Sequence, residues 1–417
     1  MASRRTFIDL FSGCGGLSLG LMNAGWRAKF ALEINPDAFA TYKHNLLSDK
    51  EIKFKHNWPS WLPQQPHNIR SVLRKHSKSL AELKGRVTLV AGGPPCQGFS
   101  SLGLRDGSDA RNDLIKDYIR FVNLVQPRFV LLENVSGIQA AHHMYHEQFN
   151  SSKKPTSGAG ILYKKLSNNY HIQSDILKAA DFGVPQSRPR FIAFGIRKDL
   201  LLKTEECPDI FNILKEVRVK FLREKGLSQR PITAEEAISD LETTGKSLVP
   251  YEYNANFRRI NYTRPTSNYQ KLLHGSMKGA TPNSLRLVNH TAKSIQKFKT
   301  VQKKCPQGKS LGRKTLQATG VKKGYLTWMS PSIPAPTVTT LPDDILHYSE
   351  PRILTVRENA RLQSFPDWYE FRGKYTTGGH KRKAECPRYT QVGNAVAPLF
   401  AECLGKLLID LEKHIKS

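Results

Sequence analysis

A cysteine stands directly after one of the buried strands that the sequence predicts. Residues 87–91 form an apolar run, and the chain then continues as Gly92-Gly93-Pro94-Pro95-Cys96. The glycines allow a sharp turn, whereas the prolines fix φ and remove two backbone donors. Open α/β sheets bind ligands at the ends of such strands, so this position suits a nucleophile. Because free cysteine is also among the most buried residue types, a purely structural thiol is the alternative.

A glycine-rich turn follows the first predicted strand, residues 6–10. Gly13, Gly15 and Gly16 permit close backbone approach to a ligand, and a helix begins after them. Glu33 comes 20 residues after Gly13, at the end of the next strand, where a carboxylate can accept from ribose hydroxyls. Ser18 replaces the third glycine of the dinucleotide fingerprint, which favours an adenosine ligand over a pyrophosphate.

A carboxylate and two arginines complete the candidate chemistry. Glu133 ends the strand predicted for residues 129–132 and shares a sheet edge with Cys96. Arg188 and Arg190 precede a further strand, residues 191–196. Taken singly, Glu133 could be a salt-bridge partner, and the arginines could be surface cations.

The elements that must position these residues alternate between strand and helix up to about residue 197. Further strands are predicted at residues 28–34 and 171–176, with His67-Asn68-Ile69 as the end of a poorly defined third strand. Helices are predicted at residues 114–125, 161–166 and 355–363, and a last one begins near Pro398. Its apolar stripe is expected to pack against the first domain.

The 417 residues carry 64 Lys and Arg against 35 Asp and Glu, a net charge of +29. Residues 253–342, here called the basic segment, contain 16 Lys and Arg and no acidic residue, with aromatic residues interspersed. A charge run is usually a solvated face, but a surplus this concentrated favours contact with nucleic acid.

Cysteine and histidine spacing argues against a metal site. The six cysteines, at positions 14, 96, 207, 305, 386 and 403, form no Cys-x-x-Cys pair. His142, His143 and His146 lack accompanying cysteine or acidic ligands. No apolar run is long enough for a bilayer, and no signal core follows the N-terminus, so we expect an intracellular protein without a membrane or an N-terminal regulatory domain.

Six motifs in order resemble those of the cytosine-C5 DNA methyltransferases, in particular the bacterial restriction–modification type. The likeness covers almost the whole chain except about residues 200–325. Its motifs are Phe11-Ser12-Gly13-Cys14-Gly15-Gly16, Pro94-Pro95-Cys96-Gln97, Glu133-Asn134-Val135, Gln186-Ser187-Arg188-Pro189-Arg190, Arg357-Glu358-Asn359-Ala360-Arg361-Leu362-Gln363 and Gly393-Asn394-Ala395-Val396.

The resemblance implies an α/β, Rossmann-like S-adenosylmethionine-dependent methyltransferase fold, with a mostly parallel sheet, helices on both faces and a smaller target-recognition domain. We expect a catalytic and cofactor-binding domain at 1–197, completed by 390–417. Residues 198–389 would form the recognition domain and hinge, including the basic segment.

The resemblance also implies roles in binding S-adenosylmethionine. Phe11 would stack on the adenine, Glu33 would hold the ribose, and Asn68 would accept from the adenine amino group. The full expected cofactor set is Phe11, Gly13, Gly15, Gly16, Glu33, Ile34, Asn68, Ile69, Pro94, Asn394 and Val396. Two positions depart from the family, which usually has Asp at Asn68 and Ser at Ala395.

In the expected reaction, Cys96 attacks C6 of a flipped-out cytosine as a thiolate. Glu133 would hydrogen-bond N3 and the exocyclic amine, Arg190 would hold O2, and Arg188 would position the site. The expected substrate-binding residues are Pro95, Gln97, Asn134 and Val135, and residues 100–112 form the expected closing loop.

The sequence therefore predicts methylation of a specific double-stranded DNA sequence by a monomer in the bacterial cytoplasm, associated with the nucleoid. A cognate endonuclease would act on the same site without binding the enzyme. Three alternatives remain: an RNA (tRNA) cytosine-C5 methyltransferase, a non-catalytic DNA-binding relative and a nicotinamide-dependent dehydrogenase. The second would be expected to lack Cys96 or Glu133, and the third leaves Pro95-Cys96 and the basic segment unexplained.

Overall fold

The structure is a computed structural model that describes residues 5–48, 56–95, 114–139, 157–201, 207–275, 277, 279–377 and 385–415. Cys96, Gln97, the predicted closing loop 100–112 and the three histidines at 142, 143 and 146 lie outside the described residues.

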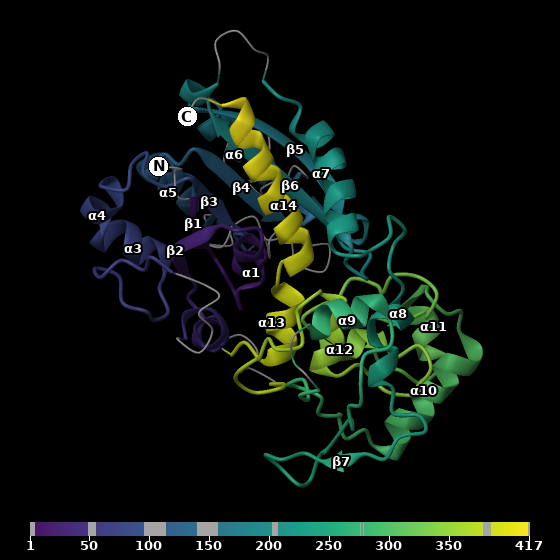
Figure 1. Ribbon diagram of the computed structural model, residues 1–417. Coiled ribbons are helices and arrows are strands. Elements are labelled where there is room, and N and C mark those ends of the chain that lie inside the picture. Colours follow the sequence, from purple (N-terminus) through teal and green to yellow (C-terminus); the bar gives the residue numbers. More distant parts are fainter. Residues whose placement is uncertain are drawn as a thin grey trace, which may run out of the picture.

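A six-stranded sheet forms the centre of the larger part of the molecule (Figure 1). Its strand order is β2-β1-β3-β4-β6-β5, and β6 runs antiparallel to both of its neighbours while the other pairs are parallel. The strands are β1 (Thr6–Leu10), β2 (Arg27–Leu32), β3 (Leu89–Gly92), β4 (Phe129–Asn134), β5 (Tyr170–Lys178) and β6 (Pro189–Arg197).

Helices cover both faces of this sheet, as the alternation of side chains along each strand requires. Phe7 of β1 and Phe129 of β4 face one core, which α1, α7 and α14 cover, whereas Ile8 and Val130 face the other, beneath α3, α5 and α6. The predicted α/β class with a mostly parallel sheet is confirmed. The helices of this part are α1 (Gly16–Asn23), α2 (Pro36–Tyr42), η1 (Lys43–Leu47), α3 (Ile69–Lys75), α4 (Ser77–Ala81), α5 (Leu114–Val125), η3 (Ser136–Gln139), α6 (Gly158–Leu166), η4 (Ala179–Phe182), η5 (Lys198–Leu200), α7 (Ile210–Glu224), α13 (Arg388–Asn394), α14 (Pro398–Leu411) and η9 (Glu412–His414).

The C-terminal helix α14 packs against α1, as the apolar stripe predicted. A Cβ atom at Gly20 would lie 2.4 Å from that of Ala401, so glycine is needed for the two helices to approach this closely. The stretch Arg388–His414 is long and apolar enough to span a membrane by length and composition, but 78% of its most apolar window is buried inside the protein. Its burial accounts for its apolar character.

A smaller region lies beyond α13 (Figure 1). It has a three-stranded sheet in the order β11-β10-β9 and a β7–β8 hairpin. Its strands are β7 (Val249–Pro250), β8 (Arg258–Arg259), β9 (Ser310–Gly312), β10 (Tyr325–Trp328) and β11 (Ile345–Leu346). Its helices are α8 (Ala234–Ile238), η6 (Ser239–Leu241), α9 (Asn268–His274), α10 (Ala292–Lys304), α11 (Arg313–Gln317), η7 (Pro342–Asp344) and α12 (Val356–Leu362).

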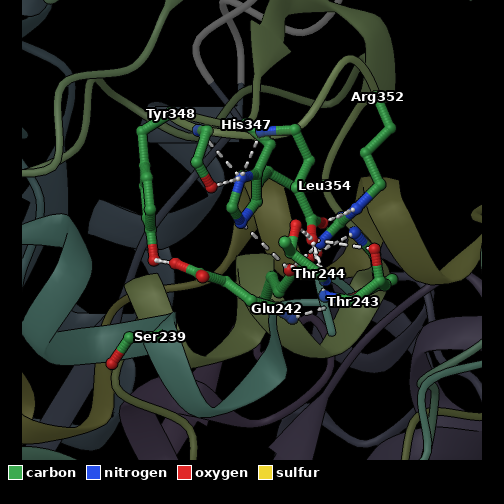
Figure 2. A network of polar contacts seen from close by, with 12 residues as sticks. Ser239, Glu242, Thr243, Thr244, His347, Tyr348, Arg352 and Leu354 are labelled. Atoms are coloured by element: carbon green, nitrogen blue, oxygen red, sulfur yellow. Dashed lines mark hydrogen bonds and ion pairs between the residues drawn. The ribbon is translucent and has the colours of Figure 1, made fainter. Parts of the chain in front are cut away.

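A polar network joins the beginning and the end of this smaller region (Figure 2). The Glu350 carboxylate accepts from the amide and hydroxyl groups of Thr243 and Thr244 at 2.6–2.9 Å and from Arg352 at 2.6 Å. Burial opposes ionisation of Glu350, but Arg352 and Thr243 lower the pKa of its carboxyl to about 2. The network therefore ties two stretches that are about a hundred residues apart.

The expected third strand at His67-Asn68-Ile69 is wrong. Helix α3 begins at Ile69, and the Asn68 side chain accepts from the Arg70 amide at 2.8 Å as its N-cap. Asparagine is a strong N-cap residue, and Pro66, two residues before it, favours a turn over a strand ladder. The described part of the sheet consequently has β3 directly beside β1.

Candidate active site

A cavity of about 480 Å³ opens at the carboxyl ends of β1 to β4, with α13 in its wall. That size is typical of small-molecule sites, roughly 300–1,000 Å³. The fold thus gathers segments from both ends of the chain around one space. Of the residues predicted from sequence, those lining it are Phe11, Gly13, Glu33, Ile34, Asn68, Ile69, Pro94, Pro95, Glu133, Asn134, Val135, Arg188, Arg190, Asn394 and Val396.

Glu133 and Arg190 face each other across two neighbouring strands. Arg190 Nε lies 2.8 Å from Glu133 Oε1, and each side chain is only 11–12% exposed. The contact arises because β6 is antiparallel to β4, so the start of one strand meets the end of the other. Burial lowers the pKa of the Arg190 guanidinium, whereas Glu133 raises it. The pair places a fixed carboxylate and a guanidinium at one wall of the cavity.

Arg188 has a different environment from Arg190. Its guanidinium is buried and donates to the carbonyls of Val338 at 2.9 Å and Gly393 at 2.8 Å. Burial lowers the pKa of Arg188 well below its usual value, and Arg190 lowers it further. Although Arg188 lines the cavity, its hydrogen bonds join the residue just before β6 to the end of the basic segment and to α13, which supports a positioning role.

The turn that leads to Cys96 is held by groups from β4. The Asn134 amide donates to the Pro94 carbonyl at 3.0 Å, and the Val135 amide donates to Asn134 Oδ1 at 2.8 Å. A Cβ atom at Gly93 would lie 3.0 Å from Glu133 Oε2, so the turn passes directly beside this carboxylate. Pro95, the last described residue before Cys96, is exposed and lines the cavity.

Glu33 is fixed by backbone donors of the glycine-rich turn. Its two carboxylate oxygens accept from the Gly13 amide at 2.9 Å and from the Asn35 amide at 2.7 Å. Burial raises the pKa of Glu33, and these amides oppose the shift. Phe11 adopts a φ of 63°, unusual for a residue with a side chain, at the turn into the cavity.

Gly15 and Gly16, which the sequence also assigned to cofactor binding, are not among the described residues that line the cavity. A Cβ atom at Gly15 would lie 2.8 Å from the Tyr369 hydroxyl, and one at Gly16 would lie 2.1 Å from the Val396 carbonyl oxygen. These two glycines therefore allow the C-terminal segment to approach the turn, and this approach brings Asn394 and Val396 to the cavity.

Asp9 is a cavity residue that sequence reasoning missed. It is fully buried in β1 and accepts from the Ser18 hydroxyl at 2.6 Å, while its Oδ1 atom has no hydrogen-bond partner among the described residues. Burial raises the pKa of Asp9 to about 7. An acidic residue inside an otherwise apolar strand was the signal that could have identified it.

Comparison with known proteins identifies the family to which this chain belongs. A profile of the C-5 cytosine-specific DNA methylases matches residues 5–410. The chain belongs to this family. It is therefore a DNA cytosine-C5 methyltransferase whose methyl donor is S-adenosylmethionine, and the predicted enzyme class and cofactor are confirmed.

The relatives of this methyltransferase include restriction–modification enzymes. The type II methyltransferase M.DdeI of Desulfomicrobium norvegicum is 30% identical, over 96% of this chain and 87% of its own. M.XorII of Xanthomonas oryzae pv. oryzae is 29% identical, over 95% and 83%. Among solved structures, a putative DNA modification methyltransferase encoded within an E. coli prophage has a TM-score of 0.64 at 24% identity, with 98% of this chain and 99% of that one covered.

The residues of the methyltransferase cavity fit S-adenosylmethionine. Glu33 offers a fixed acceptor beside the glycine-rich turn, and the unpartnered oxygen of Asp9 suits a cationic ligand. Asn68 lines the cavity, but its side-chain oxygen already caps α3. The described residues contain no group of three or more His, Cys, Asp or Glu that could hold a metal.

Proposed function

We propose that this protein transfers the methyl group of S-adenosylmethionine to C5 of a flipped-out cytosine in a specific double-stranded DNA sequence. By the same proposal, the methylation protects bacterial DNA against a cognate endonuclease, and the enzyme works as a cytoplasmic monomer. The observation that carries the proposal is the Glu133–Arg190 pair, which faces the same cavity as the Gly13–Glu33 turn, directly beside the turn that leads to Cys96.

Cys96 is the proposed nucleophile. Cytosine C5 is a weak nucleophile, so the Cys96 thiolate first adds to C6 and makes C5 electron-rich. C5 would then take the methyl group as its bond to the sulfonium sulfur breaks, which would leave a neutral thioether on the donor. Loss of the C5 proton and cleavage of the S–C6 bond restore the C5–C6 double bond and free the thiolate. We assign the removal of the C5 proton to a water molecule.

Glu133 and Arg190 hold the base during this attack. The Glu133 carboxyl group, one oxygen of which faces Gly93, is suited to accept from the exocyclic amine and to share a proton with N3, where charge develops on addition to C6. Arg190 is fixed by its Nε bond to Glu133 and by donation from Nη1 to the Pro189 carbonyl at 2.7 Å. A guanidinium held in this way can donate to the cytosine O2 without reorganisation. Pro95, Gln97, Asn134 and Val135 would contact the base or support its pocket.

The cofactor would be held along the rest of the cavity wall. Phe11 and Ile34 offer apolar surface to the adenine, since the Ile34 side chain is 63% exposed and lines the cavity. Glu33 would accept from the ribose hydroxyls, and Asp9 would face the positive charge of the amino-acid end. Ile69, Pro94, Asn394 and Val396 would close the pocket.

Base flipping costs a few kcal/mol, which contacts to the DNA must offset. The basic segment supplies cations for this purpose. Duplex DNA is favoured over RNA as the substrate because curated relatives are named as type II methyltransferases and, in Arabidopsis thaliana, as a DNA (cytosine-5)-methyltransferase.

Methylation of a random-sequence duplex library, followed by bisulfite sequencing, tests the proposal. We expect methylation within one recognition sequence, at a single cytosine position on each modified strand. We expect tRNA in a parallel reaction to remain unmodified. Methylated tRNA with unmodified DNA would contradict the proposed substrate.

Cys96→Ser tests the nucleophile in the same assay. We expect turnover to vanish while DNA binding persists, because the alcohol is a far weaker nucleophile than the thiolate. Cys207→Ser is the matched control, since Cys207 is a half-buried free thiol away from the cavity lining. Equal activity of the two variants would refute the assignment.

A further inference from the structure

The β7–β8 hairpin projects from the far end of the smaller region (Figure 1). Val249 pairs with Arg259 and Pro250 with Arg258 in antiparallel register. The turn is closed by backbone hydrogen bonds: Tyr251 donates to the Phe257 carbonyl at 2.9 Å, and Phe257 donates to the Asn254 carbonyl at 3.0 Å. These bonds give the hairpin a defined shape before any partner binds.

The tip of this hairpin presents an aromatic ring to solvent. Tyr253 is 79% exposed, the most exposed of the large apolar side chains in the described part of the chain. Residues 252–256 and Arg258 are exposed as well. The Tyr253 ring contacts that of Tyr251 edge to face, with centroids 5.4 Å apart. A supported but uncovered ring of this kind is typical of a surface that binds a partner.

A stack of alternating rings and guanidinium groups anchors the base of the hairpin. The Arg286 guanidinium carbon lies 4.1 Å from the Phe257 ring centroid and 3.8 Å from that of Tyr375. The Arg388 guanidinium carbon lies 4.4 Å from the Tyr375 centroid. The Tyr375 hydroxyl also donates to the Tyr251 hydroxyl of the hairpin at 3.2 Å. Phe257 and Tyr375 thus fix the hairpin to α13.

This anchor lies next to the wall of the candidate active site. Arg388 begins α13, and the residues on either side of it, Cys386 and Thr390, line the cavity. The hairpin is therefore mounted on the same helix that closes the cofactor end of the cavity.

The charge of the anchor is not compensated locally. In the described part of the chain, neither Arg286 nor Arg388 forms an ion pair with a carboxylate, and Arg286 Nε has no hydrogen-bond partner. Glu252 neutralises Arg259 at 2.9 Å, whereas Arg258 is exposed and pairs with no carboxylate of the described residues. A cationic surface with an exposed aromatic ring fits a nucleic acid, which offers both phosphates and bases.

We propose that the β7–β8 hairpin is a sequence-reading ribbon that enters the major groove of the substrate duplex, with Tyr253 against a base edge and Arg258 on a phosphate. The major groove, about 12 Å wide, admits a two-stranded ribbon. This inference rests on the proposed function, because it assumes that the substrate is duplex DNA.

The test compares hairpin variants on two duplexes, one with the target sequence found in the library experiment and one of scrambled sequence. Tyr253→Ala should weaken binding to the target duplex about tenfold and change binding to the scrambled duplex little, because base contacts carry the specificity. Arg258→Gln should weaken binding to both and reduce the slope of log Kd against log salt by about 1.

Matched controls come from α7, on the larger part of the molecule. Val219→Ala and Arg223→Gln change an exposed apolar and an exposed cationic side chain and should leave both affinities unchanged. Tyr253→Phe keeps the ring and should retain most of the affinity. An unchanged ratio of target to scrambled affinity in Tyr253→Ala would overturn the inference, whereas a wild-type protein that methylates no duplex would instead refute the proposed function.

Discussion

Arginines in two regions of this methyltransferase have opposite surroundings. Around the active site and α12 they are buried and their donors are satisfied. Arg190 pairs with Glu133, and Arg361 pairs with both Asp240 and Asp367 at 2.7–3.0 Å. Arg188 and Arg357 donate to backbone carbonyls instead. Among the Lys and Arg in the described part of the basic segment, ion pairs are limited to Arg259 and Lys323, whose carboxylate partners lie just outside the segment.

The difference separates two uses of positive charge. A buried guanidinium needs carboxylate or carbonyl acceptors for its donors, and its planar, fork-shaped donors then fix the geometry of the groups around it. An exposed cation without a carboxylate partner is instead available to a polyanion. Burial with satisfied donors therefore distinguishes arginines that build the site from exposed cations suited to hold DNA.

The largest effect is expected at Arg361. Its side chain is fully buried with those of Asp240 and Asp367, so Arg361→Met would leave two carboxylates without their cation. Breaking such a pair costs about 3–5 kcal/mol, which urea denaturation would measure. The control is Arg230→Gln, which breaks the more exposed Arg230–Glu236 pair and should change stability little. Equal losses would contradict the distinction between buried and exposed pairs.

Glu133 tests whether a paired residue also takes part in the chemistry. Glu133→Gln keeps the size of the side chain but removes the charge opposite Arg190, and we expect single-turnover methylation to slow roughly 10²–10³-fold. Affinity for the target duplex should change much less. Glu412→Gln, which breaks a remote pair with Arg5, is the matched control. A normal methylation rate in Glu133→Gln would mean that the Glu133–Arg190 pair has only a structural role.

Much of the catalytic part was predictable because its elements are local. The apolar runs at residues 6–10 and 129–132 specify β1 and β4, and the ends of parallel strands share one edge, so Glu133 and the Cys96 turn had to be close. Arg190 joins them because its strand starts where β4 ends.

Other features depend on contacts that no local pattern specifies. Asp240 lies 121 residues before Arg361, and the sequence gives no sign of their pairing. Asn68 suits both a ligand acceptor and an N-cap, and the structure uses it as the cap of α3. Helix α7, inside the range expected for the recognition domain, packs its apolar face against α14 of the larger part.

The lysines of α10 test whether exposed cations of the basic segment contact DNA. Lys303 and Lys304 are exposed in the last turn of this helix and have no ion pair with a carboxylate in the described part of the chain. Replacing both by Gln should reduce the slope of log Kd against log salt by up to about 2, if each contacts one phosphate. The double change Lys215→Gln and Lys220→Gln on exposed positions of α7 serves as control. Identical slopes for the two double variants would remove α10 from the DNA interface.

Asp9 is a buried carboxyl that forms no ion pair among the described residues. Because its pKa is raised to about 7 in the folded protein from about 3.9 when unfolded, the folded state holds the proton more tightly. Its contribution to stability is therefore complete below about pH 4 and is lost as the pH rises to 7. Asp9→Asn cannot ionise, so its stability relative to wild type should improve by up to about 1.4 kcal/mol for each pH unit between 5 and 7. Denaturation midpoints at several pH values would measure this, with the exposed Asp175→Asn as control. A pH-independent difference would mean that Asp9 is already ionised across this range, and that a cation compensates it after all.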